Sequence, residues 1–202
     1  MKKKVGIVIG IIILFIILGI GCYYYWNDNK EKTMENENTK NMVEQNIEAE
    51  FVPTTEEERK LAYESDEFHD FYLYDAEEQK YKLSDFIGKP MVINFWASWC
   101  KYCKEEMPDI EEIYKENRED ITFLIIDVLD KKETKEIGIQ YIRENSFSFP
   151  FYSYKDEKKA MSYYGMNKYP STLFVSKEGK VLKKKQGKMS LTELQEGINL
   201  LK

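Results

Sequence analysis

Cysteine, histidine and excess basic charge are all scarce in this chain of 202 residues. It has three cysteines, which are too few for a scaffold of structural disulfides. Its one histidine is His69, for which we expect a place at the surface or at a strand edge. The formal net charge is −6, which provides no basic surface for nucleic acid. These shortages exclude a disulfide-stabilised scaffold and a nucleic-acid-binding protein.

A charge-free apolar run stands near the N-terminus, over residues 5–20, directly after three lysines. Extended through the Tyr/Trp cluster at residues 23–26, it reaches about 20 residues, the length that spans a bilayer. Lysines favour the cytoplasmic side and aromatic residues the far interface, so everything after Trp26 is expected outside. We therefore predict an uncleaved, single-pass membrane anchor over residues 1–26. The alternatives are a cleaved signal peptide, for which no small-x-small site is obvious, and lipidation at Cys22, where Gly19 matches such sites poorly.

Residues 27–60 are rich in Asn, Glu and Lys and carry 10 acidic against 5 basic residues. This composition cannot bury enough apolar surface to offset the entropy of ordering, so we predict a flexible acidic stalk. We expect a short helix near its end, at residues 54–58. One folded domain over residues 61–202 accounts for the rest of the chain.

Strand and helix patterns alternate along this domain, which predicts an α/β fold. A final β-hairpin and a helix with a capping box at Ser190 close it. The expected strands are residues 69–74, 80–83, 91–95, 121–128, 149–152, 171–175 and 181–185, and the expected helices are residues 101–117, 132–144, 156–164 and 190–201.

Trp99-Cys100-Lys101-Tyr102-Cys103 carries the strongest chemical signal. The two cysteines lie at a strand-to-helix junction, where the helix dipole and free N–H groups favour the thiolate of the first cysteine. Thiolate is the form that attacks a disulfide, so the motif indicates thiol–disulfide exchange. The alternatives are an inert buried pair or half of a zinc site, which Cys22 and His69 would have to complete.

Several further motifs accompany this pair, and the combination resembles the thioredoxin superfamily, specifically its membrane-anchored TlpA/ResA-like thiol–disulfide oxidoreductases. The resemblance covers about residues 68–202 and implies a central mixed β-sheet with helices on both faces. It rests on Leu83-Ser84-Asp85-Phe86, Gly88-Lys89-Pro90, Val92-Ile93-Asn94-Phe95-Trp96-Ala97-Ser98-Trp99-Cys100, Cys103, Glu106, Pro108 and Tyr169-Pro170-Ser171-Thr172.

The resemblance assigns a role to each residue of the exchange site. Cys100 is the attacking thiolate and Cys103 resolves the mixed disulfide. Trp99 shields the sulfurs, the alternative being a core aromatic residue. Pro170 is implied to be a cis-proline facing the disulfide, with the backbone of Tyr169 pairing with the partner protein, the alternative being an ordinary trans proline in a loop.

Glu106 falls near the same helix side as both sulfurs. In the resembling family a glutamate here handles protons for the thiols, whereas thioredoxins proper use a buried Asp at the position of Asn94. The alternative is a solvated glutamate on a charged face. Lys101 and Tyr102, between the cysteines, are expected to tune the redox potential.

We therefore expect an extracytoplasmic, membrane-tethered oxidoreductase, and the resemblance implies that it reduces disulfides in exported proteins such as apocytochrome c. The resemblance implies that a transmembrane thiol carrier supplies the electrons and that no organic cofactor or metal is required. One alternative is a disulfide donor with the same site. The other is a non-catalytic thioredoxin-fold module, for instance a metallochaperone.

Overall fold

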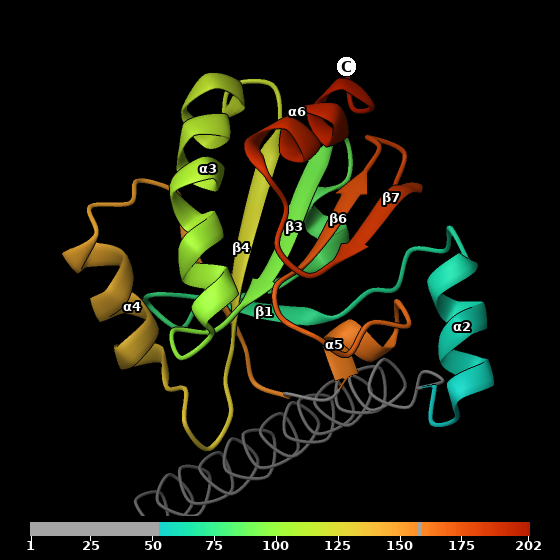
Figure 1. Ribbon diagram of the computed structural model, residues 1–202, viewed down its shortest axis with the longest axis horizontal. Helices are drawn as coiled ribbons and strands as arrows, with labels where there is room; N and C mark the ends of the chain where they lie inside the picture. Colours follow the sequence, from blue (N-terminus) through green and yellow to red (C-terminus); the bar gives the residue numbers. More distant parts are fainter. Residues whose placement is uncertain (1–52, 157–158) are drawn as a thin grey trace, which may run out of the picture. The chain divides into compact units, whose positions relative to one another are not determined.

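A mixed β-sheet forms the centre of the computed structural model, which describes residues 53–156 and 159–202 (Figure 1). Within these ranges it has seven strands in the order β2-β1-β5-β4-β3-β6-β7. Strands β3, β4 and β5 run parallel, and the other neighbouring pairs are antiparallel. The strands are β1 (Tyr72–Asp75), β2 (Lys80–Lys82), β3 (Met91–Trp96), β4 (Thr122–Val128), β5 (Phe151–Tyr154), β6 (Ser171–Val175) and β7 (Val181–Gln186).

The central strand β3 is buried along its whole length, because helices cover both faces of the sheet. Its alternating side chains enter two separate cores. Met91, Ile93 and Phe95 pack on the face covered by α5 (Lys159–Ser162), while Val92 and Trp96 pack on the opposite face. The opposite face is covered by α3 (Lys101–Asn117), α4 (Lys135–Glu144) and α6 (Leu191–Asn199). The central mixed sheet with helices on both faces, expected from the sequence, is confirmed.

Capping residues set the ends of the helices. Helix α3 has the predicted bounds, with Cys100 as its N-cap, and Ser190 forms the predicted capping box of α6. Helix α4 begins three residues later than expected, because the Thr134 side chain caps it. Helix α5 ends at Ser162, two residues before the expected end at residue 164, and Gly165 with a φ of 68° prevents the helix from resuming.

Helix α2 (Glu56–Glu64) packs against the sheet domain through its C-terminal turn. The Tyr63 hydroxyl donates to the carbonyl of Lys184, and the Lys184 ammonium donates to the carbonyl of Ala62 at 2.7 Å. The short helix expected near residues 54–58 is confirmed, and Thr55 and Glu58 form a capping box at its start. The expected boundary between residues 60 and 61 therefore falls inside a helix, and ordered structure begins earlier than composition indicated.

The expected anchor over residues 1–26 and most of the expected stalk lie outside the described ranges. Residues 53–156 and 159–202 contain no helix with the length and hydropathy needed to cross a membrane.

Candidate active site

The site is built on the turn that joins β3 to α3, where Cys100 and Cys103 form a disulfide. The N–H of Cys100 donates to the carbonyl of Ala97 at 3.0 Å and closes the turn. The Cys100 sulfur caps α3 by accepting the N–H of Cys103 at 3.1 Å. In the dithiol form the same N–H and the helix dipole stabilise a Cys100 thiolate. Cys100 is 6% exposed and Cys103 1%, so Cys100 is the sulfur nearer the surface.

Two aromatic residues beside the disulfide are exposed to solvent. Trp99 is 46% exposed and Tyr102 58%, although large aromatic residues usually bury most of their surface. The Trp99 ring also meets Tyr169 edge-to-face, with ring centroids 5.6 Å apart. This contact brings the Tyr169–Pro170 segment beside the disulfide turn, and the peptide bond of that segment is cis, as the resemblance implied.

Glu106 is fully buried on α3, one turn beyond Cys103, and is not the solvated glutamate of the alternative interpretation. The Asn94 amide donates to one of its carboxyl oxygens at 3.0 Å, and the backbone N–H of Met189 donates to the other at 2.5 Å. Burial raises the pKa of Glu106 to about 7, and the two hydrogen bonds oppose part of that effect. A carboxyl group with this pKa can both take up and release a proton near neutral pH.

Lys101, in contrast, lies at the surface. Its ammonium is 3.8 Å from the Glu105 carboxylate, and its side chain is 80% exposed. Exposed ion pairs of this kind contribute at most about 1 kcal/mol. The described contacts therefore leave Lys101 only a weak electrostatic influence on the sulfurs.

Two further buried carboxyl groups near this turn were not predicted from the sequence. Glu133 accepts a hydrogen bond from the Ser98 hydroxyl at 2.6 Å, and Ser98 belongs to the turn that carries Cys100. Asp127 lies on β4 and is fully buried. The available signal was an acidic residue inside the apolar run of residues 121–128.

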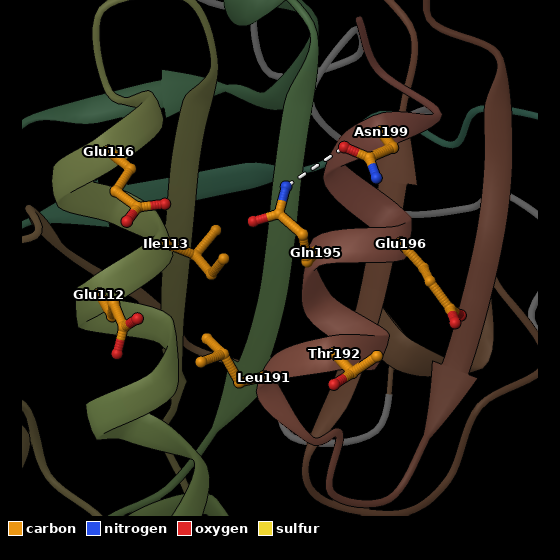
Figure 2. A pocket seen from close by; sticks show the side chains of 8 residues that line it. All are labelled: Glu112, Ile113, Glu116, Leu191, Thr192, Gln195, Glu196 and Asn199. Carbon is orange, nitrogen blue, oxygen red and sulfur yellow. Dashed lines mark hydrogen bonds between the residues drawn. The ribbon is translucent and has the colours of Figure 1, made fainter.

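A groove between α3 and α6 lies apart from this site and contains none of the predicted site residues (Figure 2). Its floor includes Ile113 and Leu191, and Glu112, Glu116 and Glu196 stand along it. No group of three or more His, Cys, Asp or Glu residues with metal-binding geometry occurs in the described part of the chain.

Comparison with known proteins identifies the family. The model of the AhpC/TSA family matches residues 65–184. Over 143 residues the chain is 31% identical to the thiol-disulfide oxidoreductase ResA of Bacillus thuringiensis subsp. konkukian, which covers 71% of this chain and 79% of that protein. ResA of Oceanobacillus iheyensis is 30% identical over 152 residues, covering 73% of this chain and 78% of the relative.

Solved structures agree with this fold. The exposed lipoprotein thioredoxin Etrx1 of Streptococcus pneumoniae superposes with a TM-score of 0.57 at 30% identity, covering 65% of this chain and 99% of that one. StoA of Bacillus subtilis shares the fold at 20% identity, with a TM-score of 0.55 and coverage of 66% and 99%. With its disulfide at the start of α3 and these relatives, the chain belongs to the AhpC/TSA family and is a thioredoxin-like, ResA-like thiol–disulfide oxidoreductase.

Proposed function

We propose that this oxidoreductase works outside the cytoplasm, tethered to the membrane by residues 1–26, and reduces disulfides in exported proteins such as apocytochrome c. A transmembrane thiol carrier would return electrons to the Cys100–Cys103 disulfide. The charge-free run behind three lysines supports the tether and its orientation.

The observation that carries the proposal is the arrangement of one outer and one inner sulfur with a buried acid behind them. Cys100 lies at the N-terminus of α3 beside the exposed Trp99, so a partner disulfide can approach it. Cys103 is buried, and Glu106 follows it by one helical turn. The outer sulfur thus suits attack, and the inner one suits release of the bound partner.

The reaction proceeds in two displacements. The Cys100 thiolate attacks one sulfur of the partner disulfide, forming a mixed disulfide and expelling the other partner sulfur as a thiolate. Cys103 then loses its proton, for which Glu106 is the proposed acceptor, and attacks the sulfur of Cys100. The S–S bond to the partner breaks, so the partner leaves with two thiols and the Cys100–Cys103 disulfide re-forms. Two electrons pass from the enzyme to the partner.

The midpoint potential of the Cys100–Cys103 couple, measured against glutathione on the full chain in detergent, tests the direction of transfer. A reductant is expected near the thioredoxin value of about −270 mV, whereas a value near −120 mV would assign the disulfide-donor alternative. Replacing either cysteine with serine should abolish turnover, while Cys22→Ser serves as the matched control. Labelling of reduced Cys100 by a membrane-impermeant thiol reagent in intact cells tests the location, and protection of Cys100 until the cells are lysed would refute it.

A further inference from the structure

A buried pair of acidic residues lies behind the disulfide turn, separate from Glu106. Asp127 is on β4, and Glu133 is in the connection between β4 and α4. Asp127 is 0% exposed and Glu133 1%. Buried carboxyl groups are costly unless they are paired, so this pair needs a physical explanation.

Glu133 holds the turn that presents Cys100. One of its carboxyl oxygens accepts the Ser98 hydroxyl at 2.6 Å, and Ser98 lies two residues before Cys100 within the closed turn. The backbone of Glu133 is itself fixed, because its N–H donates to the Asp130 carboxylate at 2.7 Å and its carbonyl accepts the N–H of Asp130 at 3.1 Å. Glu133 also immediately precedes the Thr134 N-cap, where the dipole of α4 favours a negative charge.

The remaining oxygens of the two carboxyl groups have no hydrogen-bond partner. Within the described residues, both oxygens of Asp127 and the second oxygen of Glu133 are buried and accept no hydrogen bond. Burial, followed by the charge and side-chain contact of Glu133, raises the pKa of Asp127 to about 9. Asp127 is therefore protonated at neutral pH, and its proton can bridge to the free oxygen of Glu133.

We propose that Asp127 and Glu133 share one proton and, through Ser98, position the turn that carries Cys100. They are positioning residues and do not touch the partner disulfide. The inference rests on the exchange activity of Cys100 but not on the direction of electron transfer or on the membrane location.

The surroundings of Asp127 keep this proton in place. A Cβ added to Gly138 on α4 would lie 2.0 Å from an Asp127 oxygen, so the helix backbone closes directly over the carboxyl group. The strand neighbours in register are Trp96 on β3 and Ser153 on β5, neither of which titrates near neutral pH. The charged groups that act on Asp127 are Glu133 and Asp130, and both oppose a second negative charge.

Two serines provide a matched experiment. Ser98 donates to buried Glu133 at 2.6 Å, and Ser148 donates to buried Glu111 at 2.7 Å on the far part of α3. Ser98→Ala and Ser148→Ala each remove one hydroxyl from a buried carboxylate, but only Ser98 is in the disulfide turn. The readout is the alkylation rate of Cys100 in the reduced full chain across a pH series, with Cys22→Ser as the background.

We expect Ser98→Ala to slow alkylation of Cys100 at neutral pH by about threefold or more, and Glu133→Gln to do the same, because the turn loses a charge-assisted hydrogen bond. Ser148→Ala should leave the rate and the pH profile unchanged. In the background protein, reactivity per thiolate should fall as pH passes about 9, when Asp127 ionises and repels Glu133. Asp127→Asn should remove that alkaline fall, because an amide donates without titrating.

The proposal is overturned if the profiles of Ser98→Ala and Glu133→Gln overlay that of Ser148→Ala, or if the alkaline fall survives in Asp127→Asn. Circular dichroism of each variant separates unfolding from loss of positioning. If Glu133→Gln does not fold, Ser98→Ala, which keeps both buried acids, still decides the question. A failed potential or location experiment would refute the proposed function and leave these alkylation results unaffected.

Discussion

Replacing Glu106 with glutamine should change how the stability of the oxidised protein depends on pH. Burial raises the pKa of Glu106 from its ordinary value of 4.5 to about 7. Between these two pH values the folded carboxyl group holds a proton that the unfolded chain has released. The stabilisation from Glu106 is therefore complete below pH 4.5 and is lost as pH rises through about 7.

The size of the effect follows from the same pKa. A change from 4.5 to about 7 corresponds to about 3 kcal/mol, of which about 2.5 kcal/mol is lost between pH 5 and pH 8. The other titrating groups contribute equally to wild type and Glu106→Gln. The wild-type free energy of unfolding should consequently fall by about 2.5 kcal/mol more than that of the variant over this interval.

The glutamine of the Glu106→Gln variant can keep its hydrogen bonds in the folded protein. Its carbonyl oxygen can accept the N–H of Met189, and its amide then faces Asn94. The Asn94 carbonyl oxygen accepts no hydrogen bond within the described residues, and a rotation of that amide turns it toward residue 106. The rotated oxygen can also accept the hydroxyl of Thr172, which now receives the Asn94 amide at 2.9 Å.

Urea unfolding of the oxidised protein at a series of pH values, followed by tryptophan fluorescence, measures this difference. Glu105→Gln is the control, because Glu105 neighbours Glu106 but lies at the surface in ion pairs with Lys101 and Lys188. If the wild-type and Glu106→Gln stabilities run parallel from pH 5 to pH 8, Glu106 does not titrate as its burial requires. The same variant should flatten the pH profile of thiol reactivity near neutral pH.

Three further predictions concern the packing of α2, the resolving role of Cys103 and the docking of partner proteins on Trp99. Gly165→Ala should destabilise the fold by about 2 kcal/mol or more in urea unfolding, because an added Cβ would lie 2.1 Å from the Arg59 carbonyl. Gly88→Ala, with open space around its Cβ, should cost only the positive-φ strain of about 1 kcal/mol, and equal losses would contradict the packing of α2. Cys103→Ser should accumulate mixed disulfides with partner proteins on non-reducing gels, and their absence would refute its resolving role. Trp99→Ala should lower kcat/KM for a protein disulfide by about tenfold with a smaller effect on a small-molecule disulfide, and equal losses would argue against partner docking on this ring.

The sequence predicted well those elements whose ends depend on local chemistry. The bounds of α3 followed from helical spacing after Cys100, and the start of α6 from the Ser190 capping box. The order of the strands in the sheet depends on long-range pairing, which no local pattern contains. The resemblance supplied the overall topology instead.

The lower limit of the domain was placed too late because composition was averaged over a window. Residues 27–60 are polar as a whole, yet their last part begins α2, which becomes stable only by packing. Lys184 contributes the decisive contacts from β7, more than a hundred residues along the chain. A short helix of this kind depends on tertiary contacts rather than on its own propensity.

The burial and pairing of the acidic residues in the site likewise depend on tertiary contacts that the sequence does not show. Glu106 was identified because the resemblance assigns a role to that position, but its burial and the N–H of Met189 that faces it come from the folded structure. Asp127 had no such assignment, and only its place among apolar residues distinguished it. Glu133 stands in a charged connection and looks like a solvated residue in the sequence. Pairing between the two becomes visible only when β4 and the start of α4 are brought together.

Glu106 and Asp127 titrate in different pH ranges, so their contributions to the free energy of unfolding can be measured separately. Stabilisation from Glu106 is lost as pH rises to about 7, whereas that from Asp127 continues to fall until about 9. Lys184 acts in the opposite sense at alkaline pH, because burial lowers its pKa to about 8, so its contribution is lost as pH falls through that value. The contributions of Lys184 and Glu106 are the same in wild type and in Asp127→Asn, so they cancel when the two free energies of unfolding are subtracted. A stability difference that keeps growing from pH 7 to about 9 therefore reports the Asp127–Glu133 pair, and a flat difference would show that this pair holds no proton at neutral pH.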